Sequence, residues 1–110
     1  MTKLKKNPTL RDLQKYMKQL CAERGWERDS ALEKFLLFVE EVGELAKEIR
    51  KANNLYVEKG KDAPPDLRGE MADILNYLLD IANHFDIDLE DAFREKDEIN
   101  SKRKWAKNTK

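Results

Sequence analysis

Cysteine, histidine, proline and glycine are all scarce in this chain. Its 110 residues include one Cys, one His, three Pro and four Gly. The single cysteine, Cys21, excludes an internal disulfide framework and suits a reducing compartment. The sole histidine, His84, belongs to no Glu-x-x-His pair, so the chain lacks the two such motifs that a di-iron bundle needs. No nucleophile-elbow motif accompanies His84, which argues against a Ser-His-Asp hydrolase.

An excess of charge of either sign is also missing. The 22 Lys and Arg residues balance the 22 Asp and Glu residues, so the formal net charge is +0. Nothing global therefore indicates a nucleic-acid or membrane partner. No apolar run approaches the length of a membrane span, and the first residues lack the apolar region of a secretory leader. We expect a cytoplasmic protein.

Apolar residues make up only 40% of the chain, which is at the low end for a globular protein. A chain of this length forms one small domain, residues 1–110, with a single core. Because a small and highly charged helical chain often completes its core by association, we expect a homo-oligomer, either a homodimer or a homotetramer.

The chain does contain helical periodicity with clear start signals. Thr9, Ser30, Asp66 and Asp88 each precede apolar residues at helical spacing, and each is of a type favoured at helix N-caps. Gly25 marks the end of the first helix. Strand-like alternation of useful length is absent. The sequence predicts an all-α, four-helix-bundle-like fold.

Two stretches lie outside these helices. Residues 1–8 are a basic lead-in that we expect to be mobile, and residues 53–65, with Gly60 and two prolines, are a predicted mobile loop. The apolar stripes of the second and third helices predict the residues of the core. They are Phe35, Phe38, Val42, Leu45 and Ile49 in the second helix, and Leu67, Met71, Ile74, Leu75, Leu78 and Ala82 in the third.

Two short acidic motifs lie within the second and third predicted helices: Glu40-Glu41-Val42-Gly43-Glu44 and Glu70-Met71-Ala72-Asp73. Carboxylates three residues apart on a helix project from one face. Of the four acids in these pairs, only Glu44 has a cation one turn away, Lys47. Since like charges one turn apart are unfavourable, something outside each helix must neutralise them.

A hard divalent cation is the leading candidate for that neutralising charge. Two adjacent helices, each with an acidic pair, would place four carboxylates around one point, and Mg²⁺ prefers such oxygen ligands and is usually shared with substrate phosphates. The lack of His and Cys near these acids argues against zinc. The alternative is that the acids are solvated faces of a non-enzymatic helical interaction module, although solvated faces normally mix charges of both signs.

Trp26 follows the first helix in a turn. A tryptophan in that position most often covers a helix end as part of the core. Its other use is as an aromatic wall for the flat ring of a ligand.

The two acidic motifs resemble those of the MazG-like nucleoside triphosphate pyrophosphohydrolases, members of the all-α NTP pyrophosphatase superfamily. The signature of that family is Glu-Glu-x-x-Glu on one helix and Glu-x-x-Asp on the next. The resemblance extends roughly from Leu10 to Trp105 and includes the Gly25-Trp26 turn and a later Lys96-x-x-x-Asn100. One departure is Arg103-Lys104-Trp105, where relatives often have Arg-Tyr-Pro.

The resemblance implies a hydrolase that releases pyrophosphate and a nucleoside monophosphate from a nucleoside triphosphate. It also implies a role for eight residues: Mg²⁺ would be held by Glu41, Glu44, Glu70 and Asp73, the attacking water would be oriented or deprotonated by Glu40, the phosphates or sugar would contact Lys96 and Asn100, and the base would meet Trp26. Sister activities in this class, hydrolysis of dUTP or of phosphoribosyl-ATP, remain open alternatives.

Overall fold

The computed structural model describes residues 2–60 and 64–104; Met1, part of the predicted loop (61–63) and the segment from Trp105 onward lie outside it. Its elements, in chain order, are α1 (Leu10–Arg24), a short 3-10 turn η1 (Trp26–Arg28), α2 (Ala31–Ala52), α3 (Leu67–His84) and α4 (Leu89–Ser101). The described ranges contain no strand. The all-α prediction is confirmed.

Each α-helix begins where the sequence predicted it, because a side chain caps its first amides. Thr9 accepts from the amide of Asp12 in a capping box, and Ser30 accepts from the amide of Glu33. The caps of α3 and α4 are Asp66 and Asp88, which accept from the amides of Gly69 and of Glu90 and Asp91. These bonds satisfy N–H groups that have no partner within the helix.

Gly25 ends α1 in the left-handed conformation, with φ at 74°. A residue with a Cβ is strained there, whereas glycine is not. The reversal of the chain at this glycine leads directly into η1, where the carbonyl of Trp26 accepts from Lys34 near the start of α2.

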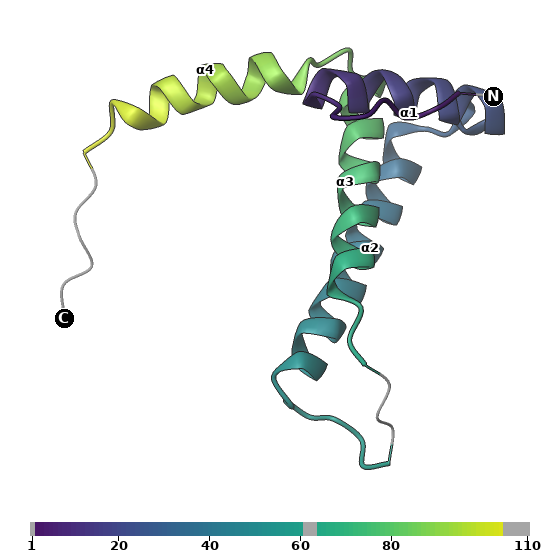
Figure 1. Cartoon of the computed structure of the whole chain (residues 1–110), viewed down its shortest axis with the longest axis vertical. Coiled ribbons are helices and arrows are strands. Elements are labelled where there is room, and N and C mark those ends of the chain that lie inside the picture. Colours follow the sequence, from purple (N-terminus) through teal and green to yellow (C-terminus); the bar gives the residue numbers. More distant parts are fainter. Residues whose placement is uncertain (1, 61–63, 105–110) are drawn as a thin grey trace.

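The helices form an open arrangement (Figure 1). α2 and α3 run side by side as a hairpin, α1 lies across the end of this hairpin where α2 begins and α3 ends, and α4 projects away from it. The radius of gyration is 17.7 Å, against about 13 Å expected for a compact chain of this length. The fold is therefore an extended helical assembly and not a closed four-helix bundle within one chain.

The core of the single chain is small and lies where α1 crosses the end of α3. Its fully or nearly buried apolar residues are Met17, Cys21, Leu79 and Ala82. The predicted stripe of α3 was wrong in part: Leu79, which it omitted, is the most buried residue, while Met71 is 53% exposed. Periodicity shows the apolar faces of a helix, whereas the crossing of α1 at this end decides which face of α3 is covered.

A buried polar contact fixes α1 to the turn between α3 and α4. The side chain of Gln14, only 7% exposed, donates to the carbonyl of Ile87 at 2.8 Å and accepts from the amide of Leu89 at 2.7 Å. Asn83 donates to the carbonyl of Gln14 at 2.9 Å. Because all these polar groups are paired, they fix the orientation of α1 relative to the turn without the free-energy cost of a buried, unsatisfied polar group.

The residues before α1 run along that helix. Thr2 donates to Glu23 and Gln19, and Lys5 pairs with Asp12 at 3.2 Å. The mobility that we expect of residues 1–8 and 53–65 stays a prediction. Within the described residues, no helix is both long enough and apolar enough to cross a membrane.

Large apolar side chains remain exposed along three helices of the single chain. They are Leu32, Phe35, Leu36, Val39, Val42 and Ile49 of α2, Met71, Leu75 and Leu78 of α3, and Phe93 and Ile99 of α4. Apolar patches of this extent usually mark an interaction surface. We therefore predict that sedimentation velocity at micromolar concentration detects a homodimer or homotetramer; a stable monomer there would contradict the prediction.

Candidate metal centre

The register between α2 and α3 brings three polar pairs into contact across the hairpin. Lys34 pairs with Asp80 near the start of α2, and the amide of Asp66 donates to Glu48 near its end. Between these two contacts, Glu41 meets Asp73. Successive pairs are seven residues apart on each helix, which is close to two helical turns, so all three lie along the same seam.

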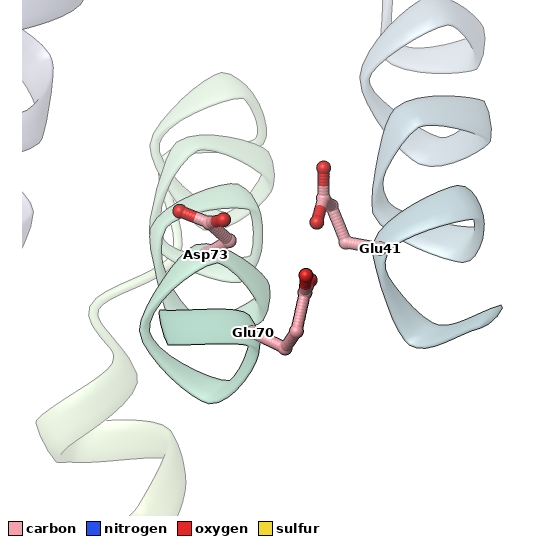
Figure 2. A group of neighbouring side chains, drawn as sticks. All are labelled: Glu41, Glu70 and Asp73. Atoms are coloured by element: carbon pink, nitrogen blue, oxygen red, sulfur yellow. The ribbon is translucent and has the colours of Figure 1, made fainter. Parts of the chain in front are cut away.

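Three carboxylates converge at the middle of this seam. Glu41 of α2 and Glu70 and Asp73 of α3 each offer an oxygen, and these oxygens all lie within 4.8 Å of one another. Figure 2 shows the side chains of Glu41 and Glu70 pointing into the gap between the helices, with Asp73 beside them. The prediction that the two acidic flanks face each other agrees with this arrangement.

Nothing cationic in the described part of the chain forms an ion pair with Glu41, Glu70 or Asp73. The Oε2 atom of Glu70 is buried and has no hydrogen-bond partner among the described residues. Burial raises the pKa of Glu70, and its contact with Glu41 and the charges of Glu44 and Asp73 raise that pKa further. The cluster is therefore electrostatically unfavourable when it holds no positive charge.

The residues of the cluster fit a hard divalent cation. Carboxylate oxygens from two helices are the ligands that Mg²⁺ takes, and such a site usually keeps open positions for water and substrate phosphate. The unpartnered Oε2 of Glu70 is the observation that favours this use, because an ion would satisfy it. Zinc is disfavoured, since no His or Cys belongs to the group.

The two remaining acids of the first motif lie at the edge of the cluster. Glu44 is exposed on α2, and its charge acts on Glu70, although its oxygens are not part of the converging group. Glu40 is exposed, and its charge acts on Tyr77: burial raises the pKa of Tyr77, and the charges of Glu41, Asp73 and Glu40 add to that effect. Glu44 is thus within electrostatic reach of the cluster, and Glu40 within reach of Tyr77.

A cavity of about 430 Å³ opens beside the cluster, toward the start of α2. Asp73 belongs to both the cluster and the cavity wall. The other lining residues come from α1, η1, α2 and α3 and from the turn after η1, and they are Met17, Leu20, Cys21, Arg24, Trp26, Asp29, Lys34, Leu37, Asn76, Tyr77 and Asp80. A concave site with aromatic, apolar and a few polar groups is typical of small-molecule pockets.

Trp26 lines this cavity and is 44% exposed, so it does not serve as a buried core lid. The guanidinium of Arg24 lies over its ring, 4.9 Å from the ring centroid. This stacking restrains the indole. Of the two uses considered for Trp26, the aromatic wall agrees better with its position.

Sequence reasoning missed the ion pair in the wall of the cavity. Lys34 is 3% exposed, and its ammonium donates to both carboxylate oxygens of Asp80 at 2.8 and 2.9 Å and to the carbonyl of Trp26 at 3.4 Å. Lys34 and Glu41 are seven residues apart on α2, as are Asp80 and Asp73 on α3. This equal spacing on the two helices could have indicated the ion pair from the sequence, but only if the register between α2 and α3 were already known.

Burial raises the pKa of Cys21, which also lines the cavity, to about 11, and the nearby carboxylate of Asp80 adds to the shift. The thiol is therefore protonated at neutral pH, which makes it a packing residue and a poor nucleophile.

Lys96 and Asn100 lie on α4, which projects away from the hairpin, and neither lines the cavity of its own chain (Figure 1). The structure thus brings together Glu41, Glu70 and Asp73, with Glu44 at their edge and Trp26 in the wall of the adjoining cavity. It leaves Glu40 exposed on α2 and Lys96 and Asn100 apart on α4. The phosphate contacts that the resemblance implies for these two residues stay a prediction.

The chain is thus an all-α protein with an acidic cluster between two antiparallel helices and a cavity beside it. Residues 30–104 match the family described as the MazG nucleotide pyrophosphohydrolase domain. The chain belongs to this family, and the matched residues include both acidic motifs, the whole α2–α3 hairpin and α4.

Two curated proteins are similar to the chain. The dCTP pyrophosphatase 1 of Mus musculus is 35% identical over 102 residues, which cover 87% of this chain and 59% of that protein. The uncharacterised protein YvdC of Bacillus subtilis (strain 168) is 29% identical over 105 residues, which cover 86% of this chain and 94% of that protein. The chain therefore spans about three fifths of the length of the mouse relative.

Proposed function

We propose that this protein is a magnesium-dependent nucleoside triphosphate pyrophosphohydrolase. The observation that carries the proposal is the convergence of Glu41, Glu70 and Asp73 around a buried oxygen without a partner. Membership of the pyrophosphohydrolase family and the similarity to a dCTP pyrophosphatase support it.

The proposed roles follow from position. Glu41, Glu70 and Asp73 hold Mg²⁺, and Glu44 joins them from the edge of the cluster. A Mg²⁺ ion held there would neutralise phosphate charge and lower the pKa of a water molecule. Glu40, exposed on the same helix, orients or deprotonates the attacking water. The cavity beside Asp73 takes the nucleoside, with Trp26 against its base.

In the proposed reaction, water attacks the α-phosphorus of the substrate, the bond from that phosphorus to the bridging oxygen breaks, and pyrophosphate leaves. The products are a nucleoside monophosphate and pyrophosphate in equal amounts. A contribution of Lys96 and Asn100 to phosphate binding would come from a second copy of the chain, because α4 leaves the hairpin of its own chain.

The experiment that tests this proposal is product analysis on a nucleotide panel with Mg²⁺. The panel contains the canonical ribo- and deoxynucleoside triphosphates, including dUTP, together with phosphoribosyl-ATP. We expect equimolar monophosphate and pyrophosphate from at least one nucleoside triphosphate. Release of orthophosphate with a diphosphate, or no hydrolysis at all, would contradict the proposal and favour the alternative of a helical interaction module.

Glu48→Gln provides the matched control for this assay. Glu48 lies on α2 one turn beyond Glu44, but its carboxylate already pairs with Lys51 at 3.4 Å and accepts from the amide of Asp66 at 3.3 Å. It is outside the converging group. The variant is expected to keep most of the activity.

A further inference from the structure

The cavity beside the acidic cluster carries polar groups that the proposed reaction does not use. Asp80 and Lys34 form its most buried charged pair, with 15% and 4% of their side chains exposed. Charged groups are rarely buried in a pocket wall without a function, because their desolvation is costly. We propose that the carboxylate of Asp80, held by Lys34, selects nucleotides whose base carries an exocyclic amino group. This inference rests on the proposed function for the place of the triphosphate.

The position of Asp80 along α3 suits a contact with the far edge of a base. Asp73, at the cluster, and Asp80 are seven residues apart on one helix, and both line the cavity. That spacing corresponds to a rise of about 10.5 Å. The distance is comparable with the length of a nucleoside monophosphate from its phosphorus to the hydrogen-bonding edge of its base. A nucleotide with its phosphates at Asp73 therefore brings this edge toward Asp80.

The ion pair gives Asp80 a fixed hydrogen-bonding character. Lys34 donates to both oxygens of Asp80, and its remaining proton points to the carbonyl of Trp26. The ammonium thus has no proton left for a ligand. The carboxylate accepts from Lys34 through both oxygens and from the Cys21 thiol, which leaves one of its four lone pairs for a ligand. The pair presents an acceptor and no donor to the cavity.

Acceptors discriminate between bases by simple complementarity. Cytosine, adenine and guanine each offer amino protons to a carboxylate. Uracil and thymine offer one ring N–H, set between two carbonyl oxygens that a carboxylate repels. A hydrogen bond to a charged partner that is lost or replaced by such repulsion costs roughly ten- to a hundredfold in affinity.

The other polar residues of the wall do not reverse this preference. The amide of Asn76 and the hydroxyl of Tyr77 both donate and accept, so either kind of base satisfies them. Asp29 offers acceptors, as Asp80 does. Arg24 is exposed and stacks on Trp26.

The test compares the binding of α,β-imido dCTP and α,β-imido dUTP, which are not cleaved, by titration calorimetry with Mg²⁺. We expect the cytosine compound to bind roughly ten- to a hundredfold more tightly. In the double variant Lys34→Met with Asp80→Asn, the buried charges are removed together and the new amide accepts or donates. The ratio of the Kd of the uracil compound to that of the cytosine compound is expected to fall to about threefold or less in this variant.

Asp86→Asn is the matched control for this variant. It makes the same chemical change in the exposed turn after α3, where φ is 54° and Asn is tolerated. The ratio is expected to stay at the parent value.

A second arm uses only the parent protein. The pyrimidin-2-one analogue lacks the amino group of cytosine and keeps the rest of the ring, so it is expected to bind roughly tenfold more weakly than the cytosine compound. This comparison tests the role of the amino group even if the double variant does not fold.

The outcomes separate this inference from the proposed function. Equal binding of the cytosine and uracil compounds by the parent protein, tighter binding of the uracil compound, or no binding of either overturns the inference. An unchanged ratio in a folded double variant overturns it too. Discrimination in binding without pyrophosphate release from any nucleotide of the panel leaves the inference standing and refutes the proposed reaction. Pyrophosphate release without discrimination in binding refutes the inference and leaves the proposed reaction standing.

Discussion

Replacing Glu70 by Gln is expected to abolish pyrophosphate release and to leave the metal-free protein as stable as the parent or more so. The amide has the shape of the carboxylate but no charge, so it is a poor ligand for Mg²⁺. Loss of a metal ligand should lower kcat/KM by roughly a hundredfold or more. Because burial and the neighbouring acids raise the pKa of Glu70, its charged form is disfavoured in the fold, and the neutral amide relieves that repulsion.

Addition of Mg²⁺ should raise the Tm of the parent protein much more than the Tm of Glu70→Gln. An ion that binds only the folded state at about 100 times its Kd stabilises a protein by about 2.7 kcal/mol, which raises the Tm of a domain of this size by roughly 10 °C. The parent should gain this shift, and Glu70→Gln should gain little of it, while Glu48→Gln should respond like the parent. A Glu70→Gln variant that loses stability without metal and keeps its activity would mean that the carboxylate is structural.

Lys34→Met is expected to destabilise the fold by about 3 kcal/mol. The substitution removes the cation but leaves the carboxylate of Asp80, whose side chain is 15% exposed, without its partner in the cavity wall. It also releases the carbonyl of Trp26, to which Lys34 donates. Urea denaturation at neutral pH measures the effect. The double variant Lys34→Met with Asp80→Asn should recover most of the lost stability, because no unpaired charge remains.

An exposed ion pair provides the control for this prediction. Lys102 pairs with Glu98 on α4, and more than two thirds of each side chain is exposed. Lys102→Met should change the stability by no more than about 0.5 kcal/mol. Equal effects at Lys34 and Lys102 would show that burial of the first pair does not matter, and the account of the cavity wall would then be wrong.

The helix starts were predictable because capping is local. Thr9, Ser30, Asp66 and Asp88 cap amides two or three residues ahead, so the sequence contains both partners of each bond. The acidic motifs were equally visible, since helical spacing alone puts Glu70 and Asp73 on one face. The pairing of acids from α2 with acids from α3 needed only the assumption that these two helices are neighbours.

The ion pair in the cavity wall was not predictable in this way. Lys34 and Asp80 lie on different helices, and their contact depends on the register of the hairpin. Residues 53–66 connect those helices, and no pattern in that connection fixes the register. Once Glu41 and Asp73 are known to meet, the same offset leads to Lys34 and Asp80.

The set of residues that form the core could not be predicted from the sequence either. Periodicity identifies the apolar faces of a helix but not which of them another helix covers. Leu79 is buried because α1 crosses α3 there, whereas Met71 and Leu75 remain exposed within one chain. The sequence predicted an all-α, four-helix-bundle-like fold, and periodicity could not show that α4 projects away from the α2–α3 hairpin of its own chain.

The central claim is that the carboxylates between α2 and α3 bind Mg²⁺ in order to position a nucleoside triphosphate. Calorimetric titration of Mg²⁺ into the parent protein and into Asp73→Asn tests it most directly, with a non-cleavable α,β-imido triphosphate present and with the heat of Mg²⁺ binding to that triphosphate alone subtracted. We predict saturable binding to the parent and none to the variant. Absence of saturable binding to the parent, or the same binding in Asp73→Asn, would contradict the claim.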